Sequence, residues 1–270
     1  MSYLPDSQFR VSEPDSFNLK DSPTRVSIFA DKTEAKTTIK DNAKAISKLS
    51  HRLYGEADRS LLIVLQGMDT SGKDGTTAAI FHRTPPLNVN VVGFKAPSKT
   101  EHAHDYLWRI HQACPKAGNI TVFNRSHYED VLIVKVRGFA PAEKIEQRYE
   151  QINQFEKHLT ENGTTILKFM LHISKDTQGE RLRDRLIKPN KRWKFNPGDL
   201  EDRKLWPDFM QAYETMIHRT STNHAPWYVI PSDSRAARGA IISGLVKDTL
   251  DKMNPQYPDP GYRPEDFDIK

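Results

Sequence analysis

Residues 67–75 have the composition and spacing of a phosphate-binding loop. Their sequence, G-M-D-T-S-G-K-D-G, fits the frame G-x-x-x-x-G-K and follows an apolar run typical of a buried strand. Glycines let backbone N–H groups approach phosphate oxygens, and the lysine neutralises the phosphate charge. We therefore expect phosphate binding by Gly67, Met68, Thr70, Ser71, Gly72, Lys73, Asp74 and Gly75. The alternative interpretation is a glycine-rich turn that opens a helix.

Two acids distinguish this loop from the ordinary pattern. Asp74 stands where a serine or threonine usually helps to hold Mg²⁺, and Asp69 lies inside the loop. A carboxylate beside a bound phosphate is repelled unless a cation lies between the two groups. Asp69 is therefore a candidate ligand for Mg²⁺, with Mn²⁺ as the alternative ion. Asp74 is equally well explained as an acid in the first turn of a helix, where the helix dipole favours it.

A second group of polar residues follows the predicted strand at 119–123. Residues 124–130 read N-R-S-H-Y-E-D. Asn124 stands where other phosphate-loop enzymes carry an aspartate that helps to hold the metal. The acids left for that role are Asp69, Glu129 and Asp130, although Glu129 and Asp130 also suit an exposed helix start. Arg125 is expected to reach the transferring phosphoryl group, because its planar guanidinium matches phosphate oxygens.

A strongly basic segment occupies residues 181–194. It contains seven Lys or Arg residues and one acid, Asp184. If its first part is helical, Arg181, Arg185 and Lys188 share one face, and their charges repel unless an anion lies among them. The phosphate ligands predicted here are Arg181, Arg185, Lys188 and Arg192, with Lys95 as a further candidate after another strand. This much charge suits a long polyanion better than a single nucleotide, and the alternative is a solvated surface.

Strands alternate with helices along most of the chain. Strands are predicted at 60–66, 89–94, 119–123, 164–173 and 226–230. Helices are predicted at 36–55, after 73, and at 101–113, 142–161, 177–187, 202–219 and 236–253, with 127–136 ambiguous. This alternation predicts an α/β fold, a three-layer αβα sandwich around a parallel sheet. Ligands of such sheets bind where the strands end, which is where the candidate residues fall.

Composition limits the possible classes of protein. The chain has 270 residues and a formal net charge of +5, which suits anionic partners. It shows neither an apolar run long enough to span a membrane nor a secretory signal, and its single cysteine, Cys114, excludes an intrachain disulfide. We expect a cytoplasmic protein with no membrane partner. The predicted organisation is an extended arm at 1–35, a domain at 36–255 that includes a basic lid at 178–200, and a tail at 256–270.

The motifs together resemble the polyphosphate kinase 2 family. The resemblance is carried by the loop at 67–75, by F-N-R-S-H-Y-E-D at 123–130, by K-R-W-K-F-N-P-G-D-L at 191–200 and by A-P-W-Y-V-I at 225–230. It implies a P-loop kinase fold similar to thymidylate kinase, an inorganic polyphosphate donor, a nucleotide acceptor and Mg²⁺. It also implies that the basic segment at 181–194 is a lid over the polyphosphate.

The resemblance extends to single residues. It implies that Asp69 and Asp130 bind metal or take part in catalysis, and that Lys73 and Arg125 contact phosphates. With Glu129 these form the expected catalytic set. Asn124 resembles the subgroup of the family that accepts AMP as well as ADP.

The reaction expected from these residues is in-line transfer of the terminal polyphosphate phosphoryl group to AMP or ADP. We expect this reaction to be reversible. A phosphate acceptor is already ionised, so catalysis needs positioning and charge neutralisation rather than a strong base. The acceptors are adenine nucleotides, with guanine nucleotides as an alternative, and we expect a homo-oligomer with no nucleic-acid partner. One alternative is an ATP-dependent nucleotide or nucleoside kinase. The other is a nucleic-acid-binding module with a vestigial loop, which would bind with a steep salt dependence.

Overall fold

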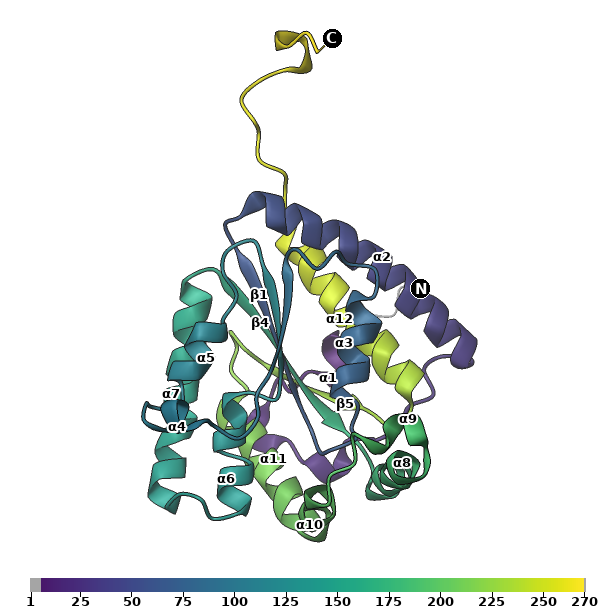
Figure 1. Ribbon diagram of the computed structural model, residues 1–270, viewed down its shortest axis with the longest axis vertical. Helices are drawn as coiled ribbons and strands as arrows, with labels where there is room; N and C mark the ends of the chain where they lie inside the picture. Colours follow the sequence, from purple (N-terminus) through teal and green to yellow (C-terminus); the bar gives the residue numbers. More distant parts are fainter. Residues whose placement is uncertain (1–5, 270) are drawn as a thin grey trace.

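Five short apolar runs form a central parallel sheet in the computed structural model, which describes residues 6–269 (Figure 1). The strands are β1 (Ser60–Gln66), β2 (Val89–Gly93), β3 (Ile120–Asn124), β4 (Thr164–His172) and β5 (Trp227–Pro231). Their order in the sheet is β2-β3-β1-β4-β5, and each neighbouring pair is parallel. All five predicted strands are confirmed, with ends within one residue of the expected positions.

The central strand β1 is buried along its whole length. Leu61, Ile63 and Leu65 belong to one hydrophobic core, and Leu62 and Val64 belong to a second core. Successive side chains of a strand point to opposite faces of the sheet, so an unbroken apolar run needs a helical layer on each side. This requirement explains why the strand shows no polar alternation.

Helices cover both faces of the sheet (Figure 1). One face carries α2 (Lys32–Glu56), α3 (Lys73–Phe81) and α12 (Arg235–Met253), and the other carries α5 (Trp108–Ala113), α7 (Ala142–Glu161) and α11 (Trp206–Thr220). The predicted three-layer αβα sandwich with a parallel sheet is therefore confirmed.

Helix α2 begins at Lys32, four residues before its predicted start. The Asp31 carboxylate caps it by accepting hydrogen bonds from the backbone N–H groups of Thr33 and Glu34. The helix packs closely on α12, because a Cβ at Gly239 would lie 2.8 Å from Ile39 Cδ1. The first and last long helices of the chain are thus neighbours.

Two predicted helices are interrupted in the structure. The segment predicted as one helix at 101–113 forms α4 (Lys99–His102) and α5. Ser98 and Glu101 form a capping box at the start of α4, and between the helices the Asp105 side chain accepts a hydrogen bond from the Leu107 N–H, which favours a turn. The segment at 202–219 forms α10 (Gly198–Lys204) and α11. Pro207 accounts for that break, because it lacks an N–H group and suits the first turn of a new helix.

The segments around the ligand-binding edge are helical. Residues 127–136, ambiguous in the sequence, form a 3-10 turn, η3 (His127–Asp130), and the short helix α6 (Ile133–Val136). The basic segment forms α8 (Lys175–Ile187) and α9 (Pro189–Arg192). The predicted lid is therefore two helices joined at Lys188, with Pro189 at the start of the second.

The N-terminal arm is docked on the domain. It contains α1 (Asp6–Phe9) and the 3-10 turns η1 (Pro14–Ser16) and η2 (Leu19–Asp21), while residues 1–5 of the predicted arm lie outside the described residues. Phe9, Val11 and Leu19 are buried. Arg10 forms an antiparallel bridge with Tyr228, and the N–H of Val11 donates to Trp227 O at 2.9 Å. The arm therefore lies along β5, at the edge of the sheet.

The end of the chain leaves the body of the molecule after α12 (Figure 1). Its described part contains one 3-10 turn, η4 (Pro264–Asp266), and Lys270 of the predicted tail lies outside the described residues. Over the described part of the chain, no helix has the length and apolar character that a membrane span requires.

The cap of α2 gives a stability prediction. Asp31→Ala removes the acceptor for two N–H groups and should destabilise the protein by about 1 kcal/mol, which lowers Tm by about 2–4 °C in a chain of this size. Asp41→Ala is the control, because Asp41 is exposed in the middle of the same helix and should change stability by less than about 0.5 kcal/mol. Thermal unfolding, followed by circular dichroism, measures both Tm values. Equal Tm values for the two variants would contradict the capping role of Asp31.

Candidate active site

The phosphate loop joins β1 to α3 at the carboxyl end of the central strand. Gly67 and Gly72 have φ values of +146° and +111°, which strain any other residue. A Cβ at Gly67 would lie 2.8 Å from Leu171 O, and one at Gly72 would lie 2.5 Å from the Arg238 guanidinium. The two glycines of the motif are therefore required by backbone conformation and by space.

Lys73 lies over the loop that precedes it. Its Nζ donates to Gly67 O at 2.6 Å, and the side chain is buried. Burial, together with the positive charge of Arg125, lowers the pKa of Lys73 to about 8. An anion bound at the loop would stabilise the ammonium form of Lys73, so this side chain is suited to binding phosphate.

Arg125 and Asp69 form an ion pair across the mouth of the loop. The Arg125 Nη2–Asp69 Oδ1 distance is 2.6 Å, and Arg125 Nη1 lies 3.8 Å from Glu129 Oε2. Arg125 has a φ of +64°, a left-handed conformation in which its N–H donates to Leu65 O. Burial would raise the pKa of Asp69, but the charges of Lys73 and Arg125 outweigh burial and lower it. Asp69 is therefore a carboxylate at neutral pH.

Glu129 lies next to this ion pair and is hydrogen-bonded to Gln66, the last residue of β1. The Gln66 amide nitrogen faces Glu129 Oε1 at 2.9 Å, while its oxygen accepts from the N–H of Ser126. Burial raises the pKa of Glu129 against the opposing charges of Arg125 and Lys73. The sequence analysis did not single out Gln66, although a polar residue that ends an apolar strand could have indicated it.

Asp130, the second predicted metal ligand, points toward a different neighbour. Its Oδ1 lies 3.5 Å from Arg148 Nη1, and its backbone oxygen accepts a hydrogen bond from the same group. Burial raises the pKa of Asp130, and Arg148 opposes this. Asp69 lines the cavity above the loop and Asp130 does not. The metal-binding role of Asp130 therefore stays a prediction.

Asp74 connects the loop, the neighbouring strand and the lid. Its two oxygens accept hydrogen bonds from Asn124 Nδ2 at 2.7 Å and from Lys194 Nζ at 3.0 Å. Burial would raise the pKa of Asp74, but these two hydrogen bonds lower it. Asp74 is thus more than an acid favoured by a helix dipole, because it ties the segment after α9 to the floor of the site.

Arg181 of α8 lies against the backbone of the phosphate loop. Its Nη1 donates to Thr70 O at 2.9 Å, and its Nη2 donates to Ser232 O and Asp233 O at 2.8 Å each. Its buried guanidinium therefore supports the loop through backbone carbonyls. Arg181 also lines the cavity above the loop, and its role as a phosphate ligand stays a prediction.

Arg238 holds the loop from the opposite side and was not predicted. Its Nη1 donates to Ser71 O and its Nε to Thr76 Oγ1, both at 2.9 Å. Burial lowers the pKa of Arg238 to about 9, with a further contribution from Arg181. Arg238 is 166 positions beyond Gly72 in the chain, so its partner could not be read from local sequence.

The remaining predicted ligands fall into two groups. Arg185 lines the cavity and pairs with Asp199 at 3.1 Å, whereas Lys188 pairs with Asp184 at 2.7 Å and Arg192 donates to Leu186 O. The cavity of about 590 Å³ is lined by the predicted residues Asp69, Thr70, Gly72, Lys73, Asp74, Gly75, Asn124, Arg125, Arg181 and Arg185. Outside its lining lie Gly67, Met68, Ser71, Lys95, Glu129, Asp130, Lys188 and Arg192.

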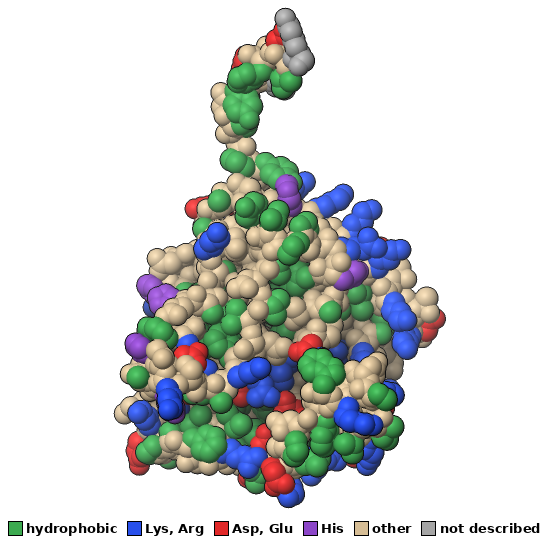
Figure 2. Space-filling view, in the orientation of Figure 1, with side chains coloured by type: hydrophobic (Ala, Val, Ile, Leu, Met, Phe, Trp, Pro, Cys, Tyr) green, Lys and Arg blue, Asp and Glu red, His purple; other side chains and the backbone are tan. Residues whose placement is uncertain are grey.

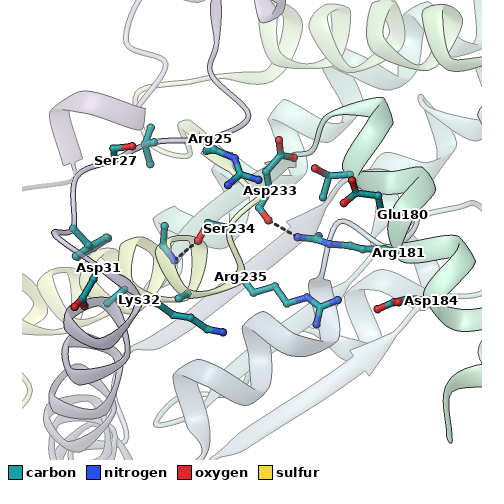
Figure 3. A pocket seen from close by; sticks show the side chains of 16 residues that line it. Arg25, Ser27, Asp31, Lys32, Glu180, Arg181, Asp184, Asp233, Ser234 and Arg235 are labelled. Atoms are coloured by element: carbon teal, nitrogen blue, oxygen red, sulfur yellow. Dashed lines mark hydrogen bonds between the residues drawn. The ribbon is translucent and has the colours of Figure 1, made fainter. Parts of the chain in front are cut away.

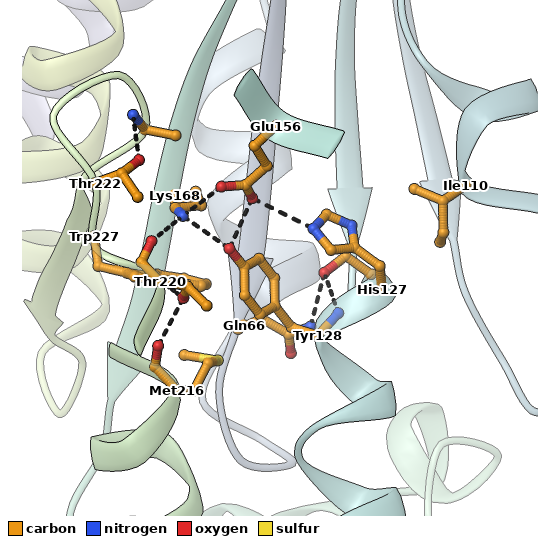
Figure 4. A network of polar contacts seen from close by, with 12 residues as sticks. Gln66, Ile110, His127, Tyr128, Glu156, Lys168, Met216, Thr220, Thr222 and Trp227 are labelled. Carbon is orange, nitrogen blue, oxygen red and sulfur yellow. Dashed lines mark hydrogen bonds and ion pairs between the residues drawn. The ribbon is translucent and has the colours of Figure 1, made fainter. Parts of the chain in front are cut away.

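A buried polar network supports the turn that carries Arg125 and Glu129 (Figure 4). Lys168 Nζ donates to Glu156 Oε2 at 2.6 Å, to the hydroxyl of Tyr128 and to Thr220 O. Glu156 Oε1 accepts from the Tyr128 hydroxyl and lies 3.3 Å from His127 Nε2. His127 and Tyr128 lie between Arg125 and Glu129, so this network holds the turn that carries both candidates.

The parallel sheet, the phosphate loop after its central strand and the lid above it define the class of P-loop kinases. A family model described as polyphosphate kinase 2 matches residues 29–258. The chain belongs to the polyphosphate kinase 2 family, as its motifs indicated.

Individual relatives agree with this family. The chain is 49% identical over 217 residues to an AMP/ADP-polyphosphate phosphotransferase of Meiothermus ruber, covering 80% of this chain and 81% of the relative. It is 37% identical over 265 residues to an ADP-polyphosphate phosphotransferase of Rhodopseudomonas palustris, covering 93% and 92%. The crystal structure of polyphosphate kinase 2 from Arthrobacter aurescens superimposes with a TM-score of 0.94 at 37% identity, covering 98% of this chain and 95% of that one.

The buried network gives a second stability prediction. Glu156→Gln leaves the Lys168 ammonium buried without its counter-charge and should destabilise the protein by about 3–5 kcal/mol. The double variant Glu156→Gln/Lys168→Met should recover much of that loss, because it removes the unpaired charge. Glu161→Gln, which breaks the exposed Lys157–Glu161 pair of the same helix, is the control and should cost less than about 0.5 kcal/mol. Urea unfolding measures the free energy of unfolding of each variant. An equal decrease for Glu156→Gln and for the control would contradict the prediction.

Proposed function

We propose that this protein transfers the terminal phosphoryl group of inorganic polyphosphate to AMP and ADP, and that the transfer is reversible. The observation that carries the proposal is the charge of the cavity above the phosphate loop. Eight Lys and Arg residues and two Asp residues line it. A single nucleotide is neutralised by fewer cations, whereas a polyphosphate chain and a nucleotide together need such a surplus. The names of the Meiothermus ruber and Rhodopseudomonas palustris relatives support this donor and these acceptors.

The residues of the floor fit a divalent cation. Asp69 is ionised, and its charge joins burial in raising the pKa of the neighbouring Asp199 to about 6. Arg125 matches the charge of Asp69 in the structure, and a phosphate bound beside Asp69 would require a further cation between the two anions. Mg²⁺ is typically held by one or two carboxylates, with phosphate oxygens and water completing its coordination. We propose Mg²⁺ at Asp69, with Mn²⁺ as an alternative.

The protein groups would act by positioning and by neutralising charge. The N–H groups of the loop and the Lys73 ammonium would hold phosphate oxygens, and Arg125 would neutralise the group in transfer. The bound cation would supply further neutralisation between the two phosphate chains. The lid, tied to the floor through Lys194 and Asp74, would keep water from the reacting phosphate. The acceptor phosphate is already ionised, so none of these residues needs to act as a strong base.

The first experiment measures the products by nucleotide chromatography. Purified protein is incubated with Mg²⁺, long-chain polyphosphate and either AMP or ADP. We expect ADP and ATP from AMP, and ATP from ADP. Lys73→Ala should lower kcat/KM by about a hundredfold or more, because one positioned charge in such a site contributes about that much. Lys95→Ala is the control and should retain near-normal rates, because Lys95 lies outside the cavity lining. Transfer from ATP in place of polyphosphate would contradict the proposed donor.

The lowered pKa of Lys73 predicts a pH dependence. A base whose pKa is lowered to about 8 loses its proton as the pH rises through 8, so the free enzyme then loses the charge that binds phosphate. We expect kcat/KM for polyphosphate to fall by up to about tenfold per pH unit above pH 8. Lys73→Arg should remove this decline, because arginine stays protonated. A decline with the same midpoint in Lys73→Arg would assign it to another group.

We also propose a homo-oligomer in the cytoplasm. Size-exclusion chromatography with light scattering measures the first directly.

A further inference from the structure

Helix α2 carries a row of positive charge that the phosphate site does not use. Lysines recur at every fourth position, at Lys32, Lys36, Lys40, Lys44 and Lys48, and Arg52 continues the row. All six side chains are exposed. Each step of four residues advances about 6 Å along the helix, so successive lysines are neighbours on its surface. Figure 2 shows Lys and Arg side chains gathered along the edge of the molecule that α2 forms.

The row is not neutralised by acids of the chain. Within residues 6–269, no salt bridge joins any of these six side chains to a carboxylate. Glu34, an acid of the same helix, accepts a hydrogen bond from the N–H of Ala30. Like charges four residues apart destabilise a helix, so the row opposes the folding of α2. An anion that bridged successive lysines would remove this repulsion.

The row begins at a cavity that adjoins the phosphate site (Figure 3). This cavity of about 540 Å³ is lined by Lys32, by Arg25 of the N-terminal arm, and by Arg181 and Arg235. Arg181 and Arg235 also line the cavity above the phosphate loop. The two cavities therefore share a wall, and basic side chains continue from the loop to the start of α2.

The acids of this second cavity are mostly engaged. Asp31 caps α2, and Asp184 pairs with Lys188 at 2.7 Å. Asp233 accepts hydrogen bonds from Thr24 Oγ1 and from the N–H of Ser174. Glu180 is the fourth acid of the lining, against four Lys and Arg residues. The lining of this cavity is thus balanced in charge, and the surplus of positive charge lies on either side of it, above the phosphate loop and along α2.

We propose that the lysine row of α2 binds the distal part of a long polyphosphate chain whose reacting end lies at the phosphate loop. The inference rests on the proposed function. Lysine suits this task, because its ammonium is a point charge on a flexible stem and imposes no fixed geometry on its partner. Each transfer shortens the donor by one phosphate, so the chain must advance toward the loop. A row of equivalent, compliant charges lets it advance without leaving the protein.

The test compares long and short donors in one variant. Lys36→Gln/Lys40→Gln/Lys44→Gln removes three charges that line neither of the two cavities. Lys44 lies about 18 Å from Lys32 along the helix, beyond the reach of a short donor bound at the loop. We expect KM for long-chain polyphosphate to rise about five- to tenfold, because each exposed ion pair contributes a modest part of the binding. KM for the shortest linear donor that the protein uses, KM for ADP, and kcat should be unchanged.

Salt dependence gives an independent readout. The slope of log KM for the long donor against log salt concentration should decrease by about 2 in the variant, because three fewer phosphate contacts release fewer counterions. The matched control is Lys116→Gln/Lys144→Gln/Lys157→Gln, three exposed lysines on other elements that also lower the net charge by three. It should leave the long-donor KM within twofold of wild type. Lys36→Arg/Lys40→Arg/Lys44→Arg keeps the charge and should also leave the long-donor KM within twofold of wild type. This variant also controls for damage to the helix caused by substitution at these three positions.

The outcomes separate this inference from the proposed function. A wild-type protein that uses no polyphosphate would contradict the proposed function itself. An active wild type whose triple variant has unchanged KM for the long donor would overturn the lysine row. An equal rise for long and short donors would overturn it too, because the effect would then come from the phosphate site. Loss of single-stranded RNA binding with unchanged polyphosphate kinetics would assign the row to a nucleic acid and overturn the inference.

Discussion

The site depends on two arginines that hold the phosphate loop by its carbonyl groups. Arg181 from α8 and Arg238 from α12 both bind Ser71 O, and Arg181 also binds Thr70 O. The peptide group of Ser71 O carries the Gly72 N–H, so the two arginines fix the orientation of that donor, whereas the Ser71 N–H donates within the loop to Met68 O. The two arginines therefore hold a glycine-rich segment in one conformation. They also place two buried positive charges behind an anion site, where those charges favour the bound phosphate.

Charge around the loop is arranged in layers. The carboxylates nearest the phosphates are each matched by a cation, as Asp69 is by Arg125 and Asp74 by Lys194. Farther from the loop, positive charge exceeds negative charge, first in the lid and then on α2. A polyanion that approaches the reacting position therefore passes from exposed lysine side chains on α2 to side chains that ion pairs hold in place near the loop. Deeper still, Lys168 and Glu156 hold the backbone of η3 without contact with solvent.

The sequence predicted those parts of the fold that local pattern determines. The strands were recognised because runs such as Leu61–Leu65 must be buried on both faces, and the phosphate loop because its glycines need special conformations. Helix breaks were missed where a turn held by a side chain or a proline outweighed the apolar periodicity, as at Asp105 and Pro207. Site residues were missed where the partner is distant in sequence.

Gln66 and Arg238 illustrate that last limit. Gln66 holds Glu129 and Arg238 holds the loop, each through a contact that the fold creates, and neither lies in a motif that indicates phosphate chemistry. Arg181 was singled out by its place in a basic run, but its contacts with the carbonyls of the loop could not be read from that run. Residue type and spacing thus identified the chemistry of the site, and tertiary packing determined which cations are free to perform it.

The docked arm and the pairing of α2 with α12 have a consequence for how the chain folds during synthesis. The arm needs β5, and the apolar face of α2 needs α12, yet these partners are made last. About 170 residues separate the end of α2 from β5, so at about 5–20 residues per second the ribosome needs on the order of 10–30 s to supply them. During that interval the arm lacks β5 and α2 lacks α12, although α2 already has β1 and α3 as partners. Docking of the arm and completion of the packing of α2 must therefore wait until β5 and α12 have been made.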